Sequence, residues 1–189
     1  HNEIKSDGIS IGGHKVTGTM TFQGGLTNPF VSLRGSAGGA VQVLAMGDQR
    51  AGVTTYYRPG TSVSQSGTLN TSGGLLDALV VDTYVGRSGT NSSGTSTGTL
   101  TFDQGNFTTD NLYIGYHTTG LPASGQTANA VGTVNVNGTA VLNVNNNITL
   151  SRKLGSSNPT GNLNVASNAV VNVKGNLQPD GSGNSSINN

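Results

Sequence analysis

The segments Val134-Asn135-Val136 and Val141-Leu142-Asn143-Val144 return 29 residues later as Leu163-Asn164-Val165 and Val170-Val171-Asn172-Val173. Apolar and polar residues alternate within each segment, which is the pattern of a β-strand with one buried face. A fixed offset combined with this alternation is typical of stacked β units, each of which buries its apolar face against the next. The repeat therefore predicts an all-β chain with the architecture of a parallel β-helix, or β-solenoid.

The repeat extends toward the N-terminus with a period of about 29–34 residues. Its opening positions are separated by 31, 34 and 29 residues, and they are Leu69, Leu100, Val134 and Leu163. The differences in length fall in a polar loop after the last strand of each unit, as expected when the strands stay in register. Each unit offers three short strands per coil, in one unit 133–136, 140–144 and 147–151.

The outward positions of such coils place asparagines above one another. Asn135 stacks with Asn164, and Asn143 stacks with Asn172, at the offset of the repeat. Two interpretations are open: amides that hydrogen-bond along the ladder, as in cross-β assemblies, or separately solvated surface side chains.

Two zones are expected within one continuous solenoid. Residues 67–189 hold the regular coils, and residues 1–66 hold degenerate coils with insertions. The N-terminal zone echoes the later repeats at two places, 19–24 with 99–105 and 44–47 with 112–115. A short helix is one interpretation of residues 74–79.

The phrases Gly98-Thr99-Leu100-Thr101-Phe102, Leu112-Tyr113-Ile114-Gly115 and Gly132-Thr133-Val134-Asn135-Val136 carry a family resemblance. They resemble the G-T-L-x-V…L-x-I-G repeats of autotransporter-type passenger regions and related large secreted bacterial β-helix proteins. The resemblance covers residues 67–189 and, less closely, 14–66. It implies a right-handed parallel β-helix displayed outside the cell, and it leaves the secretion route open.

Composition narrows the function classes. Charged residues make up 9% of the chain, its net charge is +1, and the nine basic residues are scattered. Nucleic acid is therefore not an expected partner, because phosphate binding needs a dense basic surface. Apolar runs span only a few residues, so no membrane span is expected in this segment. The chain has no cysteine, which excludes disulfides and thiol chemistry. It opens with His1 without a signal peptide, which we interpret as a processed segment of a longer protein.

The candidate catalytic and metal-binding residues of the sequence all have structural alternatives. Two G-x-S-x-G segments centre on Ser10 and Ser96, but that motif needs a turn between a strand and a helix, and neither context provides one. The histidines lack metal-ligand spacing. We therefore expect no catalytic residue, no metal and no cofactor; the histidines are His1, His14 and His117.

Asp82 and Asp110 precede the closing strands of successive units. Stacked coils would place these carboxylates about 5 Å apart, as in a calcium site or the acid–base pair of a polysaccharide lyase or hydrolase. The favoured alternative is that each aspartate caps backbone amides at a turn.

The most distinctive non-repetitive feature combines tyrosine and arginine with an acid. Adjacent tyrosines in a strand face opposite ways, so one of them is expected at the surface, where it suits sugar stacking or a protein contact. The competing interpretation is that these residues form an N-terminal lid that packs over the end of the β-helix. The candidate binding residues are Asp48, Arg50, Tyr56, Tyr57 and Arg58.

These observations favour a non-enzymatic structural protein, a β-helical stalk or fibre segment at a bacterial surface. Solenoid ends expose unpaired strand edges, so self-association through the ends is one expected partner interaction. A carbohydrate-binding adhesin with a glycan or cell-surface ligand is the first alternative. A polysaccharide-degrading enzyme is the second.

Overall fold

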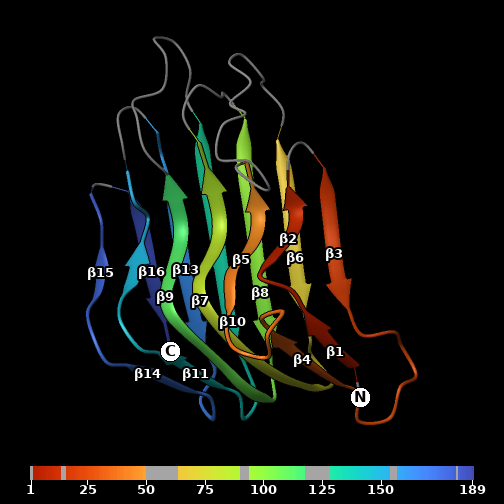
Figure 1. Ribbon diagram of the computed structural model, residues 1–189. Helices are drawn as coiled ribbons and strands as arrows, with labels where there is room; N and C mark the ends of the chain where they lie inside the picture. The colour runs from red at the N-terminus through yellow and green to blue at the C-terminus, as the bar shows by residue number, and fades with distance from the viewer. Residues whose placement is uncertain are drawn as a thin grey trace.

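The computed structural model describes residues 2–13, 16–49, 64–89, 94–117, 128–153, 157–181 and 183–189 (Figure 1). Within these residues the fold is all-β and contains no helix. The strands are β1 (Asn2–Lys5), β2 (Gly8–Gly13), β3 (Thr17–Thr21), β4 (Phe30–Arg34), β5 (Val41–Asp48), β6 (Gln65–Asn70), β7 (Leu75–Ser88), β8 (Thr95–Phe102), β9 (Gly105–His117), β10 (Asn129–Val136), β11 (Val141–Val144), β12 (Ile148–Leu150), β13 (Thr160–Val165), β14 (Val170–Val173), β15 (Leu177–Pro179) and β16 (Asn184–Asn188).

The strands form two open parallel sheets. A six-stranded sheet has the order β16-β13-β10-β8-β6-β3. A ten-stranded sheet has two branches that share the long strands β7 and β9. One branch runs β1-β4-β7-β9-β11-β14, and the other runs β2-β5-β7-β9-β12-β15. Parallel all-β pairing, expected from the repeat, is thus confirmed for the described residues.

The strand register follows the sequence repeat. Leu69 pairs with Leu100, Leu100 with Val134, and Val134 with Leu163, so all four expected opening positions occupy one column. The N-terminal echoes align as well, because Met20 pairs with Leu69. Differences in unit length therefore fall outside the paired strands, as expected.

The expectation of a helix at residues 74–79 is wrong. Leu75–Ser88 is a single strand, and over its first six residues the buried positions are Leu76, Ala78 and Val80. This period of two buries one side of the strand. Parallel partners on both sides, β4 and β9, supply the backbone hydrogen bonds.

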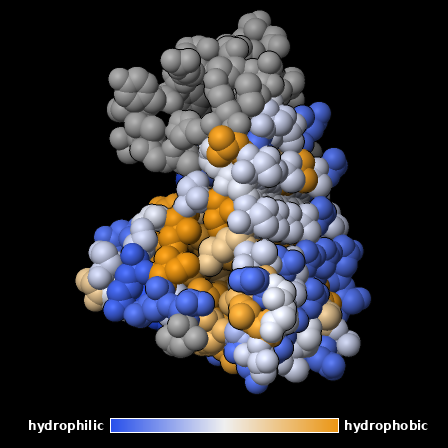
Figure 2. Space-filling view, turned by 90° about the vertical axis from the view of Figure 1, so that its right-hand side faces the viewer, coloured by the Kyte–Doolittle hydropathy of each residue, from blue (hydrophilic) through white to orange (hydrophobic). Residues whose placement is uncertain are grey.

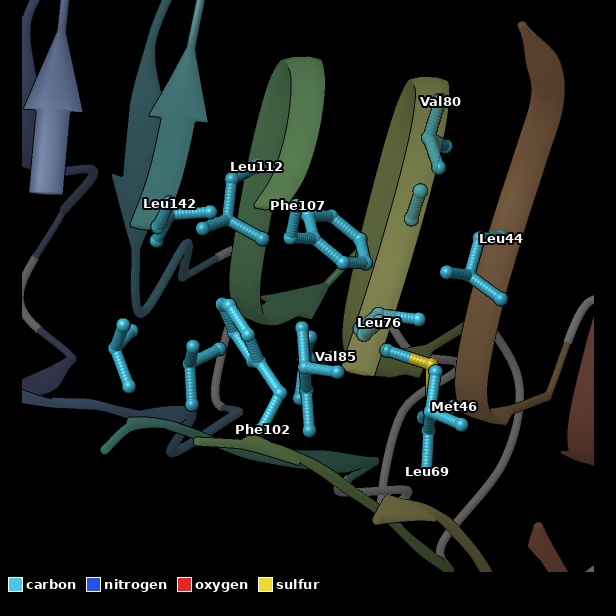
Figure 3. Close-up of a cluster of buried hydrophobic side chains, with 14 of the residues drawn as sticks. Leu44, Met46, Leu69, Leu76, Val80, Val85, Phe102, Phe107, Leu112 and Leu142 are labelled. Atoms are coloured by element: carbon cyan, nitrogen blue, oxygen red, sulfur yellow. The ribbon is translucent and has the colours of Figure 1, made fainter. Parts of the chain in front are cut away.

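The core lies between the two sheets (Figure 3). Phe102 of β8 faces Phe107 of β9, with ring centroids 5.8 Å apart, and both side chains are fully buried. Around them lie columns of buried leucine, valine and isoleucine from successive units. Burial of this apolar area, worth about 1.5–3 kcal/mol for each large side chain, is the main stabilising contribution.

Two sets of glycines mark where the sheets approach most closely. Gly115, in the L-x-I-G phrase, has φ +67°, and a Cβ there would lie under 3.0 Å from the carbonyl oxygen of Thr160. Gly132, in the G-T-V phrase, faces it, and a Cβ there would also lie under 3.0 Å from the backbone nitrogen of Gly115. Both repeated motifs thus need glycine because two backbones touch at this point.

Asparagine ladders run along the outer surface. The Asn164 amide donates to the Asn135 carbonyl at 2.8 Å, and Asn172 donates to Asn143 at 2.9 Å. Hydrogen-bonded amide stacking, one of the two interpretations of the sequence, is therefore the arrangement in the structure.

Candidate functional site

A cluster of aromatic and charged side chains lies on the outer side of the closing strands. We call it the tyrosine–arginine cluster, and it consists of Tyr84, Arg87, Tyr113, Tyr116 and Arg152 together with the acids Asp48 and Asp180. The parallel register assembles it, because β7 and β9 pair Tyr84 with Tyr113 and Arg87 with Tyr116.

Asp48 and Arg87 form a buried ion pair at the centre of the cluster. The Arg87 Nε–H donates to Asp48 Oδ1 at 2.8 Å, and its Nη2 donates to Oδ2 of the same carboxylate. The side chains are 1% and 12% exposed for Asp48 and Arg87. A bidentate pair so well shielded has little remaining capacity to bind an external charge.

The tyrosine rings pack on one another. Tyr84 and Tyr113 stack with centroids 4.7 Å apart and planes 11° from parallel, and Tyr116 meets Tyr113 at 4.6 Å with a tilt of 58°. The guanidinium carbon of Arg87 lies 3.9 Å from the Tyr84 centroid. Since Tyr113 and Arg87 both contact the face of Tyr84, this ring offers no open platform on which a sugar could stack.

The cluster ends in a second, more exposed ion pair. Arg152 Nε lies 3.2 Å from Asp180 Oδ2, and the guanidinium also donates to the Tyr116 hydroxyl and lies 4.8 Å from its ring centroid. Each arginine of the cluster thus has both an acid and a tyrosine as neighbours.

These surroundings shift the acid–base properties of the cluster. Burial, with the nearby charge of Tyr84 and Asp82, raises the pKa of Tyr113 to about 12. Burial also raises the pKa of Tyr84. Burial opposes the charge on Arg87, but the hydrogen bonds and charge of Asp48 outweigh it and raise the guanidinium pKa. At neutral pH Tyr84 and Tyr113 are therefore neutral and Arg87 is charged.

His117 lies at the end of β9 and is completely buried. Neither ring nitrogen makes a hydrogen bond of normal geometry within the described residues. Burial lowers the pKa of His117, the charge of Arg152 lowers it further, and the backbone of Gly89 acts in the opposite direction. The imidazole of the folded chain is thus neutral at neutral pH.

The expected pairing of Asp82 with Asp110 is wrong. Asp82 aligns with Asn111, whose amide donates to Asp82 Oδ1 at 2.8 Å, and Asp110 accepts from Asn145 at 2.9 Å. The two aspartates differ by 28 positions whereas this register is 29. Each carboxylate therefore faces an amide of the next unit, and the sequence-based acid pair does not form.

The remaining sequence candidates are placed as follows. Ser96 lies inside β8, is buried and accepts a hydrogen bond from Gln65, and Ser10 lies exposed on β2, so neither occupies a strand-to-helix turn. Asp48 is the described member of the candidate binding set. The other members lie outside the described residues and are Arg50, Tyr56, Tyr57 and Arg58.

Comparison with protein-family models, with curated proteins and with solved structures finds no match to this chain. Among the described residues, no group of three or more His, Cys, Asp or Glu side chains is arranged to hold a metal ion. The described residues also include no helix long and apolar enough to cross a membrane.

The tyrosine–arginine cluster was not anticipated from the sequence, although a signal for it existed. Tyr84 and Tyr113 differ by the same 29 positions as the clear repeats. Arg87 and Tyr116 differ by 29 positions as well. Asp48 and Arg87 differ by 39 positions, which is the register of β5 on β7. The echo of 44–47 with 112–115, an offset of 68, less the repeat of 29 gives the same 39 positions.

Proposed function

We propose that this chain is a segment of a right-handed parallel β-helix that serves as a stalk or fibre element at a bacterial cell surface. The observation that carries the proposal is the unbroken parallel register of six strands over one apolar core. A stack of this kind resists bending because every unit is hydrogen-bonded to its neighbours along the whole sheet.

The order of the strands supports the helical path. The chain passes from the six-stranded sheet to one branch of the ten-stranded sheet, then to the other branch, and back, as in β10, β11, β12 and β13. Crossovers between neighbouring parallel strands of one sheet are right-handed in about 98% of cases. Three strands per coil follow from this path, and in two units the long strands β7 and β9 span two of the three positions.

The edge strands support assembly end to end with a second copy. Leu177 and Ile187 at one edge are 41% and 53% exposed. In the strand register, the column of paired residues that ends at Leu177 begins at Ile9, and the column that ends at Ile187 begins at Met20. Ile9 and Met20 are partly buried. Figure 2 shows apolar side chains gathered in the middle of that second edge, with polar ones around them. Stacking β16 of one copy on β3 of another would continue the internal pattern and cover these side chains.

The charges at the two edges are complementary in the same register. Lys174 directly follows β14, the last strand of its branch; it is exposed and donates to Asn145 at 2.9 Å. The column of strand positions that ends at Lys174 begins at Asp7 on the opposite edge. Asp7 is an exposed acid that accepts hydrogen bonds from Ser36. A second copy docked in register would bring these opposite charges together.

The proposal is tested by assembly of the purified chain. Six stacked strands are only about 25 Å tall, so a visible fibre requires several copies. We expect particles of constant width and concentration-dependent length in electron microscopy and light scattering. Ile187→Lys should prevent assembly, whereas Ser186→Lys, on the outward side of the same strand, should permit it. A chain that stays monomeric at all concentrations would contradict the fibre proposal.

A further inference from the structure

The outward face of the six-stranded sheet is a regular grid of small neutral side chains. Each strand contributes alternate residues, and successive strands align them in three columns. We call this surface the threonine face. Its columns are Thr17, Ser66, Thr97, Val131, Thr160 and Asn184; Thr19, Thr68, Thr99, Thr133, Asn162 and Ser186; and Thr21, Asn70, Thr101, Asn135, Asn164 and Asn188.

The chemistry of this grid is uniform. None of its side chains is charged or aromatic, nine are threonine, and Val131 is its single member without a hydroxyl or amide group. All of them are exposed or half-buried. Each threonine presents a methyl group and a hydroxyl group side by side. The surface is therefore neutral and combines apolar and hydrogen-bonding groups at every second residue.

The grid is fixed in two directions. Neighbouring strands are about 4.8 Å apart, and alternate residues of one strand are about 6.6 Å apart. Threonine side chains are stiff because they branch at Cβ. In the third column Asn135 donates to the Thr101 hydroxyl at 2.9 Å, and Asn164 donates to Asn135 at 2.8 Å. These bonds hold that column in one arrangement.

The size and chemistry of the face argue against a macromolecular partner. Its area is about 600 Å², whereas stable protein interfaces bury about 800 Å² on each partner. It also lacks the tyrosine, tryptophan and arginine residues that anchor such interfaces. Without basic residues it cannot neutralise phosphates, and without aromatic rings it offers no stacking platform for sugars.

Ice is a rigid lattice of neutral molecules that donate and accept hydrogen bonds, so a rigid neutral grid of hydroxyl, amide and methyl groups is chemically complementary to it. We propose that the threonine face binds ice. Water molecules held by the hydroxyl groups, and confined between the methyl groups, adopt positions that continue into the crystal. The absence of charge on the face matches the neutral crystal surface, and the fixed rotamers reduce the entropy lost on ordering the interface.

The test uses the whole chain and two matched variants. Ice shaping and thermal hysteresis are measured by osmometry, and partition of the labelled chain into a growing ice front is measured in parallel. Thr99→Lys places a charge at the centre of the face. Thr149→Lys makes the same change on an outward position of β12, in the other sheet. Circular dichroism and urea unfolding establish that both variants are folded.

We expect the unmodified chain and Thr149→Lys to shape ice and partition into it, and Thr99→Lys to fall to the level of an inert control protein. Absence of ice shaping by the unmodified chain would overturn the proposal. Equal loss in both variants would also overturn it, as would binding to crystalline cellulose or chitin without any effect on ice. These results do not depend on end-to-end assembly, so they are separable from the proposed structural function.

Discussion

The contact between the two sheets makes Gly115 the position where one methyl group should do most damage. Its φ of +67° lies in the left-handed region, where a side chain costs about 1–2 kcal/mol. A Cβ would also lie under 3.0 Å from the Thr160 carbonyl oxygen, which is backbone and cannot turn aside. Overpacking of this kind costs about 1–3 kcal/mol. We therefore expect Gly115→Ala to lower the free energy of unfolding by about 2–5 kcal/mol.

Three further glycines separate the two contributions. Gly73 has φ +82° with no atom within 4 Å of a Cβ, so Gly73→Ala should show the backbone strain alone, about 1–2 kcal/mol. Gly132 has φ outside the left-handed region but the same close backbone contact, so Gly132→Ala should show the clash alone, about 1–3 kcal/mol. Gly24 has neither, and Gly24→Ala should be neutral or stabilising by up to about 1 kcal/mol.

The assay is equilibrium unfolding in urea, followed by circular dichroism and by tyrosine fluorescence, since the chain contains no tryptophan. Coincident transitions by the two probes would establish that one free energy describes each variant. If Gly115→Ala were no worse than Gly73→Ala, the sheets would not touch as described and the account of both repeated motifs would fail.

Three other residues give independent predictions. The lowered pKa of His117 means that the unfolded chain binds more protons than the folded chain, so the free energy of unfolding should fall as pH drops below about 6.5. His117→Gln should remove this part of the pH dependence of the urea midpoint. An unchanged pH dependence would contradict the burial of His117 as a neutral ring. Because the pKa of Tyr113 is about 12, one tyrosine of the folded chain should ionise at a higher pH than the others in an ultraviolet titration. The free energy of unfolding should then fall as pH rises from about 10 toward 12. Ionisation of all tyrosines near pH 10 would refute this prediction. Asp48→Ala leaves the Arg87 charge buried and should lower the free energy of unfolding in urea by about 3–5 kcal/mol. Asp77→Ala removes the acid of the Arg34–Asp77 pair, in which Asp77 is 40% exposed, and should cost about 1 kcal/mol or less. Equal costs for the two variants would argue against a buried Asp48–Arg87 pair.

The sequence carried enough information for the strands but not for the corners. Alternation and the offset of 29 indicated which residues face the core, and the columns of Leu69 and Leu100 confirm it. At the bend of β9, however, the two consecutive residues Asp110 and Asn111 both point outward. Val81 and Asp82 do the same on β7, so the register of 29 residues is kept across the bend, and the change of phase is the feature that alternation did not predict. Asp110 was misplaced for a different reason, because Tyr84 aligns with Tyr113 and not with Leu112. Corners of this kind are set by backbone geometry that a hydrophobic pattern does not record.

Packing explains only half of the repeated motif. In Gly98-Thr99-Leu100 the leucine fills the core and the glycine permits contact between the sheets, but the threonine packs against nothing inside. Threonine suits strands, yet valine, isoleucine and tyrosine suit them equally, and the outward positions of the ten-stranded sheet do vary in this way, with Leu79, Tyr84 and Arg87 on β7. The six-stranded sheet repeats hydroxyl and amide groups instead. Because folding alone does not require that uniformity, it points to a function of the outer surface of this sheet.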